Sequence, residues 1–190
     1  MKKIRFYTLL SLVFLIWYSP KLEAQVRHIP LWDNPPPFTK RLLEHDHYRE
    51  GGRITGVAVP EIIVYYPPME RANQTAILIC PGGGYGHLSM EKEGHAIARA
   101  YAEKGYLAAV LKYRLPMDEL LEEPHKVPLA DAQQGLRTLR QNAKEWNIHP
   151  DRIGIAGFSA GGHLAASASV HGEPASGATV SSNANFSILI

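Results

Sequence analysis

The sequence predicts a three-layer α/β fold in which helices cover both faces of a mainly parallel β-sheet. Short apolar segments alternate with amphipathic helical patterns along the chain, as in β-α-β units with right-handed crossovers. Two of these segments, residues 75–80 and 106–111, are almost continuously apolar, which is typical of central parallel strands covered on both faces. With 190 residues, 45% hydrophobic and 20% charged, one domain-sized core is expected.

Residues 1–24 are predicted to be a cleaved signal peptide. A basic start precedes an apolar run at residues 8–18, and Ala24 ends a small-residue exit, which is the pattern of a secretory leader. The apolar run of about 11 residues is shorter than the ~20 needed to cross a bilayer. Cleavage after Ala24 is therefore favoured over a membrane anchor, and we expect a secreted or periplasmic protein.

The mature chain is expected to be nearly neutral. Loss of residues 1–24 removes four cations and one anion and so lowers the formal net charge of +2 by three. Without a block of Lys or Arg, there is no electrostatic basis for binding nucleic acid or, after cleavage, an anionic membrane. Cys80 is the only cysteine, so neither an internal disulfide nor a cysteine-based zinc site is expected.

The N-terminal part of the mature chain is predicted to be extended. Residues 25–50 form a lead-in segment of surface chain, because its prolines disfavour helix and buried strand. Partial alternation of polar and apolar residues predicts strands at 53–59 and 61–66, which are expected to form an antiparallel start to the sheet. Residues 51–190 are assigned to the N-terminal part of the α/β domain.

The remaining elements follow from periodicity. Residues 97–102 have helical spacing, and Gly105 suits a left-handed helix stop. A stripe from Leu129 to Trp146 predicts a longer helix that ends before Pro150. A strand at 152–156, a helix at 160–170 and an apolar strand at 186–190 complete the pattern. Because the chain ends within that last strand, we expect a sheet that is incomplete at the C-terminus.

The sharpest chemical signal is the G-x-S-x-G sequence from Gly157 to Gly161, which lies between an expected strand and an expected helix. Such a tight turn excludes side chains at 157 and 161, so these glycines fit a nucleophile elbow that exposes Ser159 above the sheet. The turn also directs the N–H of Ala160 toward a developing oxyanion. A glycine-bounded turn whose serine only caps the helix is the alternative.

A second glycine-rich segment, residues 81–86, directly follows the strand at 75–80. Gly83 and Gly84 are candidate oxyanion-hole donors, because an amide approaches a substrate oxygen closely where no Cβ intervenes. Tyr85 and His87 are candidate substrate contacts. The phosphate-binding patterns G-x-x-x-x-G-K-[ST] and G-x-G-x-x-G are absent, and a flexible loop without function is the alternative.

These motifs together resemble the carbohydrate-esterase branch of the α/β-hydrolases, which includes acetyl xylan esterases and feruloyl-esterase-like proteins. The resemblance covers about residues 28–190, and its matching segments are residues 30–32, 81–85, 113–116, 128–132 and 157–165. It implies ester hydrolysis through an acyl-enzyme, with Ser159 as nucleophile and amides of Gly83, Gly84 and Ala160 as oxyanion hole. It also implies an acetylated or feruloylated polysaccharide or a smaller ester as substrate, and neither cofactor nor metal.

In this fold an acid and then a histidine follow the serine on later loops. After Ser159 the sequence offers only His163, His171 and Glu173. His163 is expected to be a packing residue, and His171 lies on the order of 15 Å away at 1.5 Å per residue. The 190 residues are therefore expected to lack the triad acid and histidine and to be inactive alone, and the alternative is a degenerate, non-catalytic module with a binding role.

Two upstream residues complete the set of candidates. His125 is expected at the surface or facing substrate. Asp131 lies near the start of its expected helix, where a carboxylate is favoured by the helix dipole, and this explains it without a catalytic role.

Overall fold

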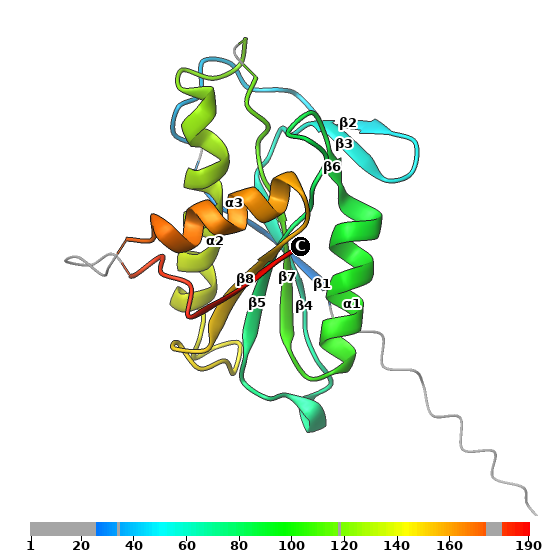
Figure 1. The fold of residues 1–190 in the computed structure, drawn as a ribbon, viewed down its shortest axis with the longest axis vertical. Helices are drawn as coiled ribbons and strands as arrows, with labels where there is room; N and C mark the ends of the chain where they lie inside the picture. The colour runs from blue at the N-terminus through cyan, green and yellow to red at the C-terminus, as the bar shows by residue number, and fades with distance from the viewer. Residues whose placement is uncertain (1–25, 34, 118, 174–179) are drawn as a thin grey trace, which may run out of the picture.

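The computed structural model describes residues 26–33, 35–117, 119–173 and 180–190. At its centre is a six-stranded sheet with the order β1-β4-β7-β5-β8-β9 (Figure 1). A smaller sheet with the order β2-β3-β6 lies beside it. The predicted signal peptide at 1–24 lies outside the described residues and stays a prediction.

The elements have the following bounds. The strands are β1 Val26–Pro30, β2 His47–Arg49, β3 Arg53–Gly56, β4 Glu61–Tyr65, β5 Ala76–Cys80, β6 Leu88–Ser89, β7 Leu107–Lys112, β8 Ile153–Gly157 and β9 Phe186–Leu189. The helices are α1 Ala96–Glu103, α2 Val127–Gln141 and α3 Ala160–Val170, with short 3-10 helices at Met69–Arg71 and Pro124–Lys126 and a π-helix at Met90–His95.

The centre of the large sheet is parallel, as predicted. β5 pairs in parallel with β7 and β8, and β8 pairs in parallel with β9. β4 joins β7 antiparallel, and β1 joins β4 in the same sense. Every residue of β4, β5, β7 and β8 is buried, so continuous apolar runs mark the covered strands.

Helices cover both faces of this sheet, which confirms the three layers. Leu78 pairs with Ala109 and Ile79 with Val110, so Leu78 and Val110 point to opposite faces because side chains alternate along a strand. Gly135 of α2 lies against Leu78, whereas Gly94, just before α1, lies against Val110. Figure 1 accordingly shows α1 on one side of the sheet and α2 and α3 on the other.

The predicted pairing of residues 53–59 with 61–66 is wrong. β3 belongs to the small sheet and pairs with β2 and β6. β4 instead lies between β1 and β7. All five of its residues are buried, and a strand on each side supplies hydrogen-bond partners for its buried backbone groups. The lead-in segment is also more structured than expected, since it contributes β1 and β2; β1 is mostly exposed and lies at the edge of the large sheet.

The predicted end of α1 is confirmed, whereas that of α2 is not. Gly105 follows α1 with a φ of +94°, and a Cβ there would lie 2.1 Å from the carbonyl oxygen of Arg71, which confirms a left-handed stop. The long helix, however, ends at Gln141, earlier than its apolar stripe suggested. Ala143 and Trp146 are still buried, because the turns that follow α2 keep them against the core.

Candidate active site

Ser159 lies on the turn between β8 and α3, with φ 51° and ψ −117°. This left-handed conformation is strained for a residue with a Cβ. The residue is exposed, and its side chain makes no capping hydrogen bond although it stands at the N-cap position of α3. The tight turn expected from the sequence is therefore present, and the capping alternative finds no support.

Glycine is required on both sides of this turn. A Cβ at Gly157 would lie 2.0 Å from the carbonyl oxygen of Gly161, and a Cβ at Gly161 would lie 2.1 Å from that of Cys80. Both contacts are with backbone atoms, which cannot move aside as a flexible side chain could. The steric argument made from the sequence therefore holds at both positions.

Backbone hydrogen bonds fix the turn to the two neighbouring strands. The N–H of Phe158 donates to Cys80 at the end of β5 (3.2 Å). The N–H of Ser159 donates to the carbonyl of Ile190 (2.7 Å), and the N–H of Ile190 donates to Gly157 (3.0 Å). The position of Ser159 is thus set by β5 on one side and by the chain after β9 on the other.

The glycine loop, residues 81–86, leaves β5 next to this turn. Gly83 and Gly84 have φ values of 133° and 61°, and Tyr85 also has a positive φ of 59°. The carbonyl of Gly83 accepts hydrogen bonds from the N–H groups of Gly86 (3.0 Å) and His87 (3.2 Å). A Cβ at Gly83 would lie 2.1 Å from the carbonyl oxygen of His87, whereas one at Gly84 would meet nothing within 4 Å. Packing thus requires glycine at 83, and the backbone conformation favours it at 84.

Three N–H groups, one at the start of α3 and two in the glycine loop, are available to a ligand. Within the described part of the chain, the amides of Gly83, Gly84 and Ala160 donate to no protein acceptor. Gly84 is exposed, and Gly83 and Ala160 are half-buried. Free N–H groups beside a serine match what a developing oxyanion needs. Their role as an oxyanion hole stays a prediction.

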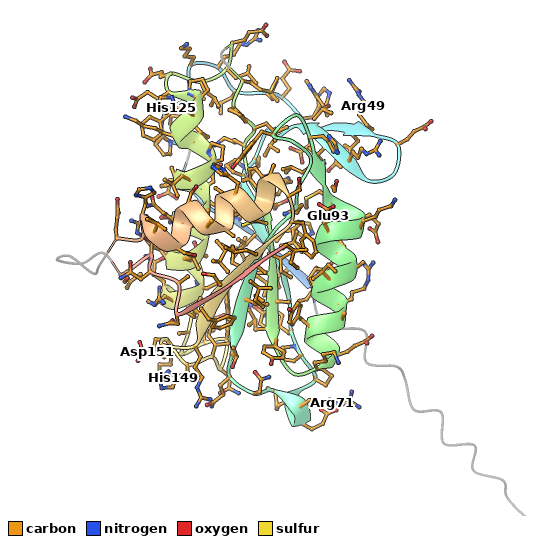
Figure 2. The ribbon with its side chains drawn as sticks, viewed as in Figure 1. Arg49, Arg71, Glu93, His125, His149 and Asp151 are labelled. Carbon is orange, nitrogen blue, oxygen red and sulfur yellow. The ribbon has the colours of Figure 1, made fainter. Side chains whose placement is uncertain are left out.

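Two side chains hold the start of the glycine loop. A carboxylate oxygen of Glu93 accepts the N–H of Gly82 (2.8 Å), and the hydroxyl of Tyr113 donates to the carbonyl of Pro81 (2.8 Å). Figure 2 shows Glu93 near the carboxyl end of the sheet. Burial raises the pKa of Tyr113, so its hydroxyl keeps the proton that it donates. No sequence signal indicated Glu93, which lies eleven residues beyond its partner.

Burial also raises the pKa of the Cys80 thiol, which is fully enclosed at the end of β5. The thiolate, rather than the thiol, is the nucleophile. Cys80 therefore does not compete with Ser159, and it is a small apolar residue of the core.

The tip of the glycine loop is tied to α3. The hydroxyl of Tyr85 and Nδ1 of His163 are 2.9 Å apart, and the Tyr85 ring also lies edge-on to the ring of Tyr113 (6.4 Å between centroids). Burial raises the pKa of Tyr85, which keeps the phenol protonated. His163 is exposed, so its expected role as a packing residue is wrong: the tilt of a helical side chain toward the helix N-terminus brings its ring to the loop.

An open cavity lies along α3 beyond this pair. It has a volume of about 570 Å³, and its lining includes Tyr85, His125, His163, Ser167 and His171. We call it the α3 cavity. The other candidate substrate contact, His87, does not line it, and its Nε2 is near the hydroxyl of Ser89 (3.5 Å). A substrate contact by His87 stays a prediction.

Asp131 belongs to a buried ion pair, which corrects the explanation by the helix dipole. It is fully buried in the second turn of α2. Its two oxygens accept hydrogen bonds from Nη2 (2.7 Å) and Nε (3.0 Å) of Arg114 and from the indole N–H of Trp32 (2.7 Å). Arg114 also donates to the carbonyl of Pro37 (2.8 Å). The network joins the lead-in segment, the chain after β7 and α2.

The described residues give Ser159 no base. His163 contacts Tyr85, Glu173 forms an ion pair with Arg137, and His171 follows the far end of α3. In the same part of the chain, no group of three or more His, Cys, Asp or Glu side chains could hold a metal ion. There, too, no helix is both long and apolar enough to cross a membrane.

A mostly parallel sheet that presents a serine on a strained strand-to-helix turn, next to a glycine-rich loop after the neighbouring strand, defines an α/β hydrolase. The family model BD-FAE matches residues 62–187. The chain belongs to the BD-FAE family.

Individual relatives agree with this assignment. The chain is 39% identical over 104 residues to the acetylxylan esterase of Xylanibacter ruminicola, covering 55% of this chain and 20% of that protein. It is 34% identical over 114 residues to endo-1,4-beta-xylanase B of Butyrivibrio fibrisolvens, covering 60% of this chain and 17% of that protein. The chain thus spans about a fifth of the length of these curated relatives.

A solved structure extends the likeness to most of the chain. The acetyl ester-xyloside bifunctional hydrolase of Caldicellulosiruptor lactoaceticus is 29% identical and superimposes with a TM-score of 0.69, covering 89% of this chain and 58% of that one. The likeness therefore extends beyond the residues of the family match, and it confirms the predicted fold class.

Proposed function

We propose that the protein is a serine carboxylic ester hydrolase and that Ser159 is its nucleophile. The observation that carries this proposal is the strained, exposed Ser159 beside three N–H groups without a protein acceptor. Strain of this kind persists where the surrounding structure imposes it, and it is concentrated at functional sites. The likeness to proteins named as esterases supports the same reaction class.

The reaction proceeds in two steps. The hydroxyl oxygen of Ser159 attacks the ester carbonyl carbon, and a histidine base takes the hydroxyl proton. The oxyanion of the tetrahedral intermediate accepts hydrogen bonds from the N–H groups of Gly83, Gly84 and Ala160. Collapse breaks the bond to the alcohol, which leaves with the proton from the histidine. A water molecule then hydrolyses the acyl-enzyme by the same route and regenerates Ser159.

The histidine base and the acid that orients it are not among the described residues near Ser159. In the α/β-hydrolase fold they follow the serine in the order acid, then histidine. Residues 1–190 alone are therefore expected to be inactive, and activity is to be measured on the product of the complete reading frame.

The substrate is proposed to be a polysaccharide that carries acetyl or feruloyl esters. Two relatives support the acetyl group and the xylan backbone by their names, an acetylxylan esterase and an acetyl ester-xyloside hydrolase. Secretion or export to the periplasm, proposed from the leader-like residues 1–24, suits a polymer that does not enter the cell.

A degenerate binding module is the second candidate, because no described histidine or carboxylate contacts the Ser159 side chain. Release of acetate from acetylated xylan separates the two. The ester hydrolase is expected to release acetate, and feruloylated xylan tests the second acyl group. A protein that binds acetylated xylan but releases no acid would be the module, and chemically deacetylated xylan is the control.

The Tyr85–His163 contact is expected to contribute to turnover, because it ties the glycine loop to the helix that starts at Ser159. One neutral hydrogen bond contributes roughly 1 kcal/mol, and 1.36 kcal/mol corresponds to tenfold in rate. Tyr85→Phe is therefore expected to lower kcat for 4-nitrophenyl acetate about fivefold with little change in KM.

His163→Leu should have the same effect as Tyr85→Phe, whereas His163→Asn keeps a polar atom near the Nδ1 position and should retain most of the activity. Tyr106→Phe is the control for loss of a hydroxyl, because Tyr106 lies just before the start of β7, at the end of the sheet away from Ser159. Full activity in both Tyr85→Phe and His163→Leu would show that the contact has no role in turnover.

A further inference from the structure

We propose that the α3 cavity is the subsite for the alcohol side of the ester and that it takes an uncharged ring rich in hydroxyl groups, as a sugar unit is. This inference rests on the proposed function and adds to it the place where the polysaccharide binds. It is carried by the position of the cavity, its size and the chemistry of its walls.

The cavity begins at Tyr85 and His163, one helical turn from Ser159, and extends along α3. His163 is one helical turn beyond Ser159, and its N–H donates to the Ser159 carbonyl (2.9 Å). Ser167 and His171 follow at intervals of four residues and also line the cavity, so the wall continues for roughly 12 Å beyond His163 at 1.5 Å per residue. A group attached to an ester carbonyl at Ser159 therefore has room along α3.

The size of the cavity indicates which part of the substrate it holds. Its volume of about 570 Å³ lies within the roughly 300–1,000 Å³ of ligand pockets. An acetyl group fills only a small part of such a space. The larger, alcohol side of an acetyl ester is the part that matches it.

The walls combine apolar surfaces with hydrogen-bonding groups. Tyr85, His125, His163 and His171 supply rings with apolar faces and polar edges, and Ser167 supplies a hydroxyl. Proline and leucine side chains complete the lining. A sugar ring presents C–H faces and hydroxyl groups in the same way, so each kind of surface has a partner.

Other ligand classes fit these walls less well. Among the described lining residues there is no Asp, Glu, Lys or Arg, so a charged ligand lacks a counter-charge. An alkyl chain would leave five polar side chains of the lining without partners. The cavity therefore favours a neutral, hydroxylated ligand.

His171→Ala is the direct test, because His171 is exposed and belongs to the wall farthest along α3 from Ser159. In the product of the complete reading frame, we expect kcat/KM for an acetylated xylo-oligosaccharide to fall about tenfold, as for a lost hydrogen bond and ring contact. For ethyl acetate, whose alcohol part is small, kcat/KM should stay the same. His125 lines the cavity from the segment before α2, and His125→Ala should change the two kcat/KM values in the same way.

Val170→Ala is the matched control, since Val170 is exposed on the same helix and does not line the cavity. If His171→Ala changed kcat/KM equally for both substrates, or changed it for neither, the proposal would be overturned. A changed preference between 4-nitrophenyl acetate and 4-nitrophenyl octanoate would assign the cavity to the acyl chain and would also overturn it.

A binding measurement separates this proposal from the proposed function. Calorimetric titration with unacetylated xylotriose needs no ester hydrolysis. Binding that is weakened about tenfold by His171→Ala but not by Val170→Ala would support the subsite even if no ester were hydrolysed. Absence of xylotriose binding to the parent protein would refute the subsite, even if 4-nitrophenyl acetate were turned over.

Discussion

Ser159→Ala is expected to lower kcat for ester hydrolysis by about 10⁴- to 10⁶-fold, as removal of an activated serine does in other serine hydrolases. The substitution removes the attacking oxygen and leaves the N–H groups of the glycine loop in place. Steady-state kinetics on 4-nitrophenyl acetate, with the product of the complete reading frame, measures the effect.

The stability of two variants distinguishes a loss of the nucleophile from unfolding. Ser159→Ala retains a Cβ and therefore the strained backbone, so its melting temperature should match the parent. Ser159→Gly relieves a strain of roughly 1–3 kcal/mol, which outweighs the ~0.4–1 kcal/mol that the freer unfolded chain costs. Ser159→Gly should thus be inactive and at least as stable. More than a tenth of the parent activity in either variant would place the nucleophile elsewhere.

Asp131→Asn is expected to lower the free energy of unfolding by about 3–5 kcal/mol, the range for removing one partner of a buried ion pair. Arg114 would lose its counter-charge while buried, with 6% of its side chain exposed. An amide nitrogen in place of one carboxylate oxygen would also face N–H donors from Arg114 or Trp32. The whole free energy of unfolding of a folded domain is only about 5–15 kcal/mol, so this loss is large.

Urea denaturation of parent and variant measures this loss. Asp151→Asn is the control, because Asp151 is exposed at the opposite end of the sheet, as Figure 2 shows, and its change should stay within about 0.5 kcal/mol. A similarly small change in Asp131→Asn would show that the network does not contribute to stability. Trp32→Phe removes one hydrogen bond but no charge, and it should cost less than Asp131→Asn.

The parts of the fold that the sequence predicted correctly depend on local signals. β5 and β7 were recognisable because strands covered on both faces are apolar at almost every position. The turn at Ser159 was recognisable because its G-x-S-x-G sequence lies between a strand pattern and a helix pattern, although the contact that excludes a side chain at 161 comes from Cys80 on another strand. The left-handed stop at Gly105 is likewise a local requirement.

The parts that were predicted wrongly depend on distant residues. Nothing within residues 53–66 shows that β4 takes β1 and β7 as neighbours and leaves β3 to another sheet. The partner of Tyr85 is 78 residues away, and that of Trp32 is 99 residues away. Spacing in the sequence cannot reveal such contacts, although the segments that carry the family resemblance include all three residues of the Asp131 network.

The role of Ser159 can be tested most directly with a fluorophosphonate probe, which forms a covalent bond only with a serine activated by a base. The product of the complete reading frame is incubated with the probe and digested, and its peptides are analysed by mass spectrometry. We predict one adduct, on the peptide that contains Ser159, and none in Ser159→Ala. A folded parent protein without an adduct, or with an adduct on another serine, would contradict the assignment of Ser159 as the nucleophile.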